Sequence, residues 1–217
     1  MSNPLTRTGA ALTGILLMTL GACSTDPDST RCRLPPDGTV LAIGDSITRG
    51  FGADGQGYAE QLQTLFKASP GRTGVRVLNR GIDGERTSGL LERIDAMLGE
   101  DRPSVVLVTI GGNDFLRKAD ESETRANLES IVNRIRAAGA YPVVFAVPRP
   151  SLAAAAGLGS DHPLYAQLAE STGTGLIEDV VGDVLAEEEL RSDTIHPNAL
   201  GYARMAEAAF EALSECG

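Results

Sequence analysis

Short apolar segments alternate with amphipathic segments along the chain from Thr39 onward. Between and after the apolar segments, apolar positions at helical spacing predict helices near 58–68, 87–98, 121–138, 164–171 and 198–214. The apolar runs have the length and the Val, Ile and Leu content of strands, and they occupy residues 39–43, 75–79, 104–110 and 142–147, with a weaker run at 175–177. Strands that alternate with helices in this way predict an α/β fold, with a parallel sheet of about five strands covered by helices on both faces.

The length and the charge of the chain narrow the class of protein. With 217 residues, 42% hydrophobic and 22% charged, the composition is that of a globular protein, and we expect one domain over residues 39–217. The net charge of −10 at pH 7 makes nucleic acid a poor partner and disfavours broad contact with anionic lipid headgroups. Any membrane attachment should therefore come from an anchor.

The first residues of the chain have the pattern of a targeting segment. Arg7 precedes an apolar run that is too short to span a bilayer. An ordinary cleaved secretory signal is one interpretation, but Leu20-Gly21-Ala22-Cys23 resembles a bacterial lipobox. That resemblance implies that residues 1–22 are a lipoprotein signal peptide and that Cys23 becomes the lipid-modified N-terminus. The polar, proline-bearing residues 23–38 then tether an exported domain to a bacterial membrane, on its periplasmic or cell-surface face.

Two further cysteines, Cys32 and Cys216, lie near the two ends of the predicted domain. In an exported protein such a pair is expected to form a disulfide, although two unrelated thiols are the alternative. Closing so long a loop stabilises a fold by roughly 5 kcal/mol on the chain-entropy model.

Chemically useful residues follow three successive predicted strands. Ser46 comes directly after the first strand in Gly44-Asp45-Ser46, a glycine-flanked segment with Gly81 follows the second, and Gly111-Gly112-Asn113-Asp114 follows the third. In open α/β sheets, ligands bind beyond the carboxyl ends of the strands, so we expect these residues on one rim. A serine hydroxyl, backbone N–H groups and a side-chain amide are a nucleophile and oxyanion donors for acyl transfer. Each motif taken alone also fits a plain turn.

The chain has two histidines, and their contexts differ. His196 lies in Asp193-Thr194-Ile195-His196-Pro197, where Asp193 can accept the Nδ1 hydrogen and leave Nε2 free as a base. We expect Pro197 at the first position of the last helix. His162 is interpreted as a helix-entry residue without a catalytic role.

Nucleotide and metal cofactors lack support in the sequence. Residues 50–55 match the G-x-G-x-x-G dinucleotide fingerprint, but the match starts several residues after the strand, and no helix follows it directly. A flexible lip beside Ser46 is the better interpretation. The sequence contains no phosphate-binding P-loop, CxxC pair or HExxH motif, so we expect no cofactor and no metal.

Taken together, the four blocks resemble those of the SGNH or GDSL-type esterase and lipase family, in its bacterial thioesterase I, arylesterase and lysophospholipase branch. The compact spacing and the runs 77–81 (VLNRG) and 110–117 (IGGNDFLR) carry the resemblance, which covers residues 39–214. It implies the SGNH hydrolase fold, a three-layer α/β/α arrangement with a flavodoxin-like parallel sheet.

The resemblance also implies a role for each residue of the four blocks. It makes Ser46 the nucleophile, His196 the base and Asp193 the acid that orients the base. The backbone N–H groups of Ser46 and Gly81 and the side chain of Asn113 become the oxyanion hole.

The function implied is that of a serine carboxylester hydrolase that forms an acyl-enzyme on Ser46. Its expected substrate is a small acyl ester, short- to medium-chain or aryl, with thioesters and lysophospholipids left open. The alternatives are a carbohydrate O-deacetylase of the same fold and a non-catalytic binding lipoprotein. Arg80 stands before Gly81 where the branch has a small residue, so we expect it to change the mouth of the site. The apolar residues expected to line an acyl pocket are Phe115, Leu116, Pro148 and Leu152.

Overall fold

The computed structural model describes residue 1 and residues 31–149 and 160–217 of the chain. Its centre is a sheet in which all neighbouring strands are parallel, in the order β2-β1-β3-β4-β5. The strands are β1 (Thr39–Gly44), β2 (Arg76–Gly81), β3 (Val105–Thr109), β4 (Tyr141–Phe145) and β5 (Gly175–Ile177). The predicted α/β class and the flavodoxin-like strand order are confirmed.

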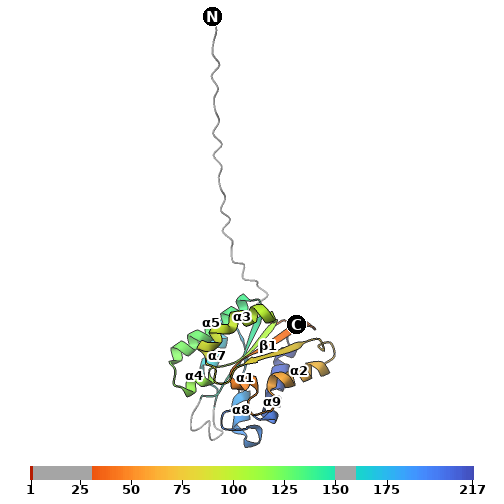
Figure 1. The fold of residues 1–217 in the computed structure, drawn as a ribbon, viewed down its shortest axis with the longest axis vertical. Helices are drawn as coiled ribbons and strands as arrows, with labels where there is room; N and C mark the ends of the chain where they lie inside the picture. The colour runs from red at the N-terminus through yellow and green to blue at the C-terminus, as the bar shows by residue number, and fades with distance from the viewer. Residues whose placement is uncertain (2–30, 150–159) are drawn as a thin grey trace.

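Helices cover both faces of the sheet, because each parallel connection must cross over it. The long helices are α2 (Tyr58–Ala68), α3 (Thr87–Asp101), α5 (Glu121–Ala137), α7 (Leu164–Thr172) and α9 (Ala199–Ser214). Helices α2 and α9 pack together on one face, and α3 packs beside α5 on the other (Figure 1). The five predicted helices are present, with ends within three residues of the expected ones.

The sequence pattern did not predict the short helices at the strand ends. These are α1 (Ser46–Arg49), α4 (Gly112–Leu116), α8 (Val180–Ala186) and the 3₁₀ turn η2 (Glu188–Leu190). Helices α1 and α4 have one turn each, which is too short for apolar periodicity to show. Both begin directly beyond a strand, so they decide which side chains reach the rim.

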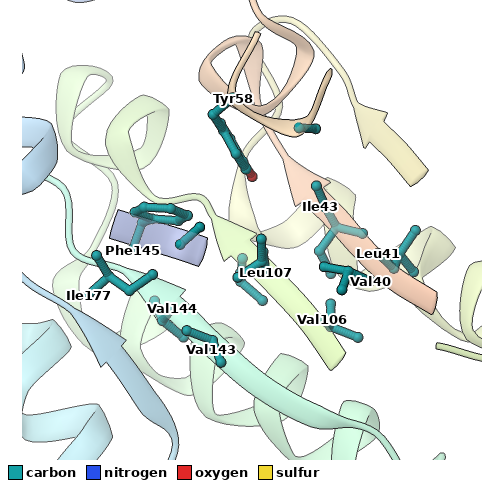
Figure 2. Packing of buried hydrophobic residues seen from close by; sticks show 14 of the residues in the cluster. Val40, Leu41, Ile43, Tyr58, Val106, Leu107, Val143, Val144, Phe145 and Ile177 are labelled. Carbon is teal, nitrogen blue, oxygen red and sulfur yellow. The ribbon is translucent and has the colours of Figure 1, made fainter. Parts of the chain in front are cut away.

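The core is continuous through the two central strands. Every residue of β1 and of β3 is buried, which is why both segments are almost uninterrupted apolar runs. Figure 2 shows Leu41, Val106 and Leu107 in this layer, and the ring of Tyr58 packs 5.2 Å from that of Phe145 above it. A site built on the ends of these strands therefore rests on a rigid base.

The folded domain begins before the predicted boundary at Thr39. Leu34, which was assigned to the tether, is buried in the core, and Cys32 forms a disulfide with Cys216. The structure thus contains the expected disulfide. The part of the predicted tether before Arg31, which includes Cys23, lies outside the described residues. Among the described residues, no helix is both long and apolar enough to cross a membrane.

Candidate active site

Three side chains from two distant segments form a hydrogen-bonded row at the carboxyl end of the sheet. Ser46 Oγ lies 2.9 Å from His196 Nε2, and His196 Nδ1 lies 2.8 Å from Asp193 Oδ2. The serine and the histidine are 150 residues apart in sequence. The structure thus brings together the three residues predicted to form the triad.

Ser46 is presented by a tight turn between β1 and α1. Gly44 has φ +144°, and a Cβ there would lie 1.9 Å from the Thr109 carbonyl oxygen, so only glycine lets the ends of β1 and β3 approach so closely. Asp45 then caps α1, because its Oδ1 accepts a hydrogen bond of 3.0 Å from the Ile47 N–H. These two constraints place Ser46 at the first position of α1, on the rim.

His196 and Asp193 lie on a loop that the start of α9 holds in place. Asp193 Oδ1 accepts hydrogen bonds from the backbone N–H groups of Ile195 and His196, so the loop folds back on the carboxylate. Asn198 is the N-cap of α9, accepting from two N–H groups of its first turn. Pro197 therefore lies before the helix, and the prediction that it occupies the first helical position was wrong.

The environment of Asp193 favours its ionised form. Partial burial acts to raise the pKa of this carboxyl, but the hydrogen bonds from His196 and from the Ile195 N–H outweigh it, so the pKa lies below its ordinary value. An ionised Asp193 holds the hydrogen on Nδ1 of His196. Nε2 is then left to accept a proton from Ser46.

A cavity of about 410 Å³ opens beside Ser46 and is mostly apolar. Leu116 and Pro148, which were predicted to line an acyl pocket, do so, while Leu152 lies outside the described residues. Sequence reasoning missed the contribution of α8, although its amphipathic pattern directly after β5 could have indicated it. The apolar wall consists of Ile47, Phe51, Leu116, Val147, Pro148, Val181, Leu185 and Ile195.

Phe115 does not line this cavity, contrary to the prediction. Its ring stacks on the imidazole of His162, with centroids 4.2 Å apart, and also contacts Tyr165. His162 is buried, and its Nδ1 accepts from the Leu164 N–H at the start of α7, as a helix-entry residue would. Burial lowers the pKa of His162, with a smaller opposite effect of Glu121. This histidine is part of the packing behind α4 and not of the triad.

Gly81, which was predicted to donate to the oxyanion, does not line the cavity. Gly81 is the last residue of β2, and its N–H donates to Asn79 Oδ1 at 3.0 Å. A Cβ on Gly81 would lie 2.3 Å from the Arg49 nitrogen, so the residue faces α1 and not the cavity. Gly84 lines the cavity instead, in a left-handed conformation with φ +71°, and no acceptor for its N–H is present among the described residues. The tight packing of β2 against α1 explains why a glycine is needed at position 81.

Asn113 and Asp45 meet beside the nucleophile. Both line the cavity, and Asn113 Nδ2 donates to Asp45 Oδ2 at 3.3 Å. Burial raises the pKa of Asp45 to about 7, although the hydrogen bonds from the Ile47 N–H and from Asn113 lower it. The negative charges of Glu85 and Asp114 raise it further. Asp45 is thus a strongly desolvated carboxyl within the site.

Arg80 does not shape the mouth of the cavity, contrary to the expectation. Arg80 pairs with Asp101 and Glu100 at the end of α3, and it does not line the cavity. Phe51 of the glycine-rich lip does line it, with its ring 4.5 Å from that of His196. In the described part of the chain, no cluster of three or more histidine, cysteine or acidic residues could hold a metal ion.

A serine, histidine and aspartate in this order of contact, beside amide donors and an apolar cavity, define a serine hydrolase. The GDSL-like lipase/acylhydrolase family profile matches residues 42–204. The chain belongs to this family and is an ester hydrolase of the GDSL type.

Individual relatives show the extent of the similarity. The chain is 31% identical over 173 residues to the esterase TesA of Pseudomonas aeruginosa, an alignment that covers 78% of this chain and 84% of the relative. It is 27% identical to the Escherichia coli protein named thioesterase 1/protease 1/lysophospholipase L1, over 74% of this chain and 76% of that one. The solved structure of the psychrotrophic esterase EstA from Pseudoalteromonas sp. has a TM-score of 0.71 and 25% identity, and the match covers 82% of this chain and 98% of EstA.

Proposed function

We propose that this chain hydrolyses carboxylic acyl esters through a covalent acyl-enzyme on Ser46. His196 Nε2 takes the hydroxyl proton while Ser46 Oγ attacks the ester carbonyl, and Asp193 stabilises the imidazolium that forms. The N–H groups of Ser46 and Gly84 and the Asn113 amide stabilise the oxyanion. The intermediate then collapses: the bond from the acyl carbon to the alcohol oxygen breaks, His196 gives its proton to the leaving alcohol, and the acyl group stays on Ser46 Oγ.

The second half of the reaction uses the same groups. His196 takes a proton from a water molecule, which attacks the acyl carbon and forms a second oxyanion intermediate. The collapse of this intermediate releases the acid and returns the proton to Ser46. The observation that carries the proposal is the unbroken hydrogen-bonded row from Ser46 through His196 to Asp193 at the mouth of an apolar cavity.

Two measurements on Ser46→Ala test the nucleophile. We expect this variant to lose turnover of a p-nitrophenyl ester and labelling by a fluorophosphonate probe, while Ser214→Ala, at the far end of α9, keeps both. The similar esterase EstA has been solved in a form inhibited by monoethylphosphonate, which supports this choice of probe. A Ser46→Ala variant with normal turnover would contradict the proposal. A native protein that binds esters without turnover or labelling would favour the binding lipoprotein.

The acyl group is proposed to be short- to medium-chain. A mostly apolar cavity of about 410 Å³ suits hydrocarbon better than sugar hydroxyls, which need polar partners. This favours acyl esters over an acetylated carbohydrate, and the names of the relatives keep aryl esters, thioesters and lysophospholipids within the proposed range.

A substrate series separates these possibilities. We expect kcat/KM for p-nitrophenyl esters to rise from acetate to a medium-chain acyl group and to fall for longer chains. Leu185→Ala should move the optimum to longer chains, because it widens the apolar wall. An acetate optimum together with good turnover of acetylated xylan would instead support the O-deacetylase.

We propose further that Cys23 is lipid-modified and that the exported domain lies on the periplasmic or cell-surface face of a bacterial membrane. The lipobox resemblance supports this anchor. The disulfide at Cys32 lies beside Tyr141 and Gly175, the first residues of β4 and β5, whereas Ser46 follows the carboxyl end of β1. An anchor on that side leaves the mouth of the cavity open.

Labelling of growing cells with an alkyne fatty acid tests the anchor. We expect the label on the native chain in the membrane fraction, and neither label nor membrane retention for Cys23→Ser. Ser24→Ala is the control that should behave as the native chain. A native chain that is processed but unlabelled and soluble would support the ordinary secretory signal.

A further inference from the structure

One buried carboxyl in the site has no part in the mechanism above. Asp45 is 3% exposed, and its backbone N–H donates to the Thr109 carbonyl at 3.2 Å, which ties it to the end of β3. The chain that leaves β3 carries Asn113 only a few residues later. Asp45 is therefore fixed relative to both the nucleophile and the oxyanion donor.

The two oxygens of Asp45 serve two different elements. Oδ1 accepts from the Ile47 N–H at 3.0 Å and caps α1, while Oδ2 accepts from Asn113 Nδ2 at 3.3 Å. A carboxylate accepts hydrogen bonds at both of its oxygens. An amide or a hydroxyl of the same size has only one oxygen, so it cannot accept from both donors in this way. The residue type at position 45 thus follows from the need for two acceptors.

To donate to an oxyanion, the side-chain amide of Asn113 must present its nitrogen, and not its oxygen, to the substrate. The side chain of Asn113 is nearly symmetric in shape, and a half turn would place its oxygen where its nitrogen now lies. An oxygen in that place would repel a developing oxyanion. Above its pKa of about 7, Asp45 is a carboxylate that attracts only the nitrogen end, and it uses one of the two amide hydrogens, which leaves the other for the substrate.

We propose that Asp45 is a positioning residue that holds the Asn113 amide in its donating orientation, beyond its role as the cap of α1. This inference rests on the proposed function, because it assumes that Asn113 donates to the oxyanion. Asp114 offers a matched comparison within the same turn. It is equally buried at 3%, but its oxygens accept from Thr87 at the start of α3 and not from Asn113.

Steady-state kinetics of a set of variants tests the inference, with the p-nitrophenyl ester that the substrate series shows to be best. Asp45→Asn keeps the shape of the side chain. Asp45→Ser keeps a short oxygen that can cap the Ile47 N–H but cannot reach Asn113. We expect each to lower kcat by about 10- to 100-fold while KM changes less than about threefold, because only the transition state is affected. Asp114→Asn should keep kcat within about threefold of the native value.

The double variant Asp45→Ser with Asn113→Ala distinguishes positioning from a general structural effect. We expect Asn113→Ala alone to lower kcat by about 100-fold or more, and the double variant to be less than about threefold slower than that. Full multiplication of the two losses would show that Asp45 acts through α1 and Ser46, and would overturn the inference.

Other outcomes are equally decisive. Native kcat in both Asp45 variants, or an equal loss in Asp114→Asn, would overturn the positioning role while leaving the proposed function intact. Native kcat in Asn113→Ala would instead remove the oxyanion role of Asn113 in the proposed function, and this inference with it.

Discussion

The carboxyl of Asp45 has an energetic cost that can be measured as a function of pH. Burial raises its pKa from 3.8 to about 7, so the folded state holds a proton that the unfolded state loses as the pH rises above about 4. The stability contributed by this group is fully present below pH 3.8 and is lost as the pH rises to about 7. A shift of this size corresponds to at most about 4 kcal/mol.

We therefore expect Asp45→Asn to gain stability relative to the native chain as the pH rises. The difference in the free energy of unfolding between variant and native chain should increase from about pH 4 to about pH 7, by up to about 4 kcal/mol, and level off above that. Urea unfolding at several pH values measures it. Asp120→Asn is the control, because hydrogen bonds from the Ser122 side chain and from the Glu123 and Ser122 N–H groups hold the pKa of Asp120 below its ordinary value. Its difference should be flat above pH 5, and a flat result for Asp45→Asn as well would contradict the prediction.

Single residues were predictable from the sequence where the chemistry restricts the choice. Two histidines left a short search for a base, and Asp193 three residues before His196 could fold back on it. Gly81 was misjudged because the sequence does not show where β2 ends. Pairing with β1 continues as far as Gly81, and the Ile82 N–H still donates to the Gly44 carbonyl, so the rim begins only beyond them, at the turn that contains Gly84.

At the scale of elements, the long helices and the strands followed from their periodicity, but the contacts between helix ends did not. Helix α3 has no cap of its own, because Arg86 at the N-cap makes no side-chain hydrogen bond. Asp114 of α4 supplies the cap instead, accepting from the Thr87 N–H at 3.0 Å and from its hydroxyl at 2.7 Å. A cap supplied across space leaves no signal at spacing three or four in the sequence.

The cap from α4 leads to a prediction about stability. Asp114→Ala leaves two donors of buried Thr87 without this acceptor, so we expect a loss of about 3 kcal/mol in the free energy of unfolding. Asp120→Ala removes an ordinary exposed cap from α5, and we expect a clearly smaller loss from it. Urea unfolding of both variants compares them directly. Equal losses would mean that the cap from α4 contributes no more than a local one.

In the whole molecule, the catalytic triad and the disulfide lie at opposite ends of the sheet. The triad lies beyond the carboxyl ends of the strands, whereas the disulfide between Cys32 and Cys216 lies near the first residues of β4 and β5. The sequence indicated this pairing through the position of the two cysteines near the domain ends. It did not indicate that Arg72 also holds this end, donating to the carbonyls of Leu213, Ser214 and Cys216.

This separation predicts that breaking the disulfide affects stability and not catalysis. The bond closes a loop of 184 residues, for which the chain-entropy model gives a stabilisation of about 5 kcal/mol. We expect removal of the bond to lower the free energy of unfolding by about 3 to 5 kcal/mol. In the variant with Cys32→Ser and Cys216→Ser, Arg72 still holds the end of α9, so the domain should fold and kcat should stay within about twofold of the native value. Urea unfolding with and without a reductant measures the loss, and the reductant should leave the double variant unchanged. A parallel fall in kcat at temperatures where the variant is folded would contradict this prediction and show that the two ends of the sheet are coupled. Strain would then pass from the start of β4 and β5 to the loops that carry Ser46 and His196.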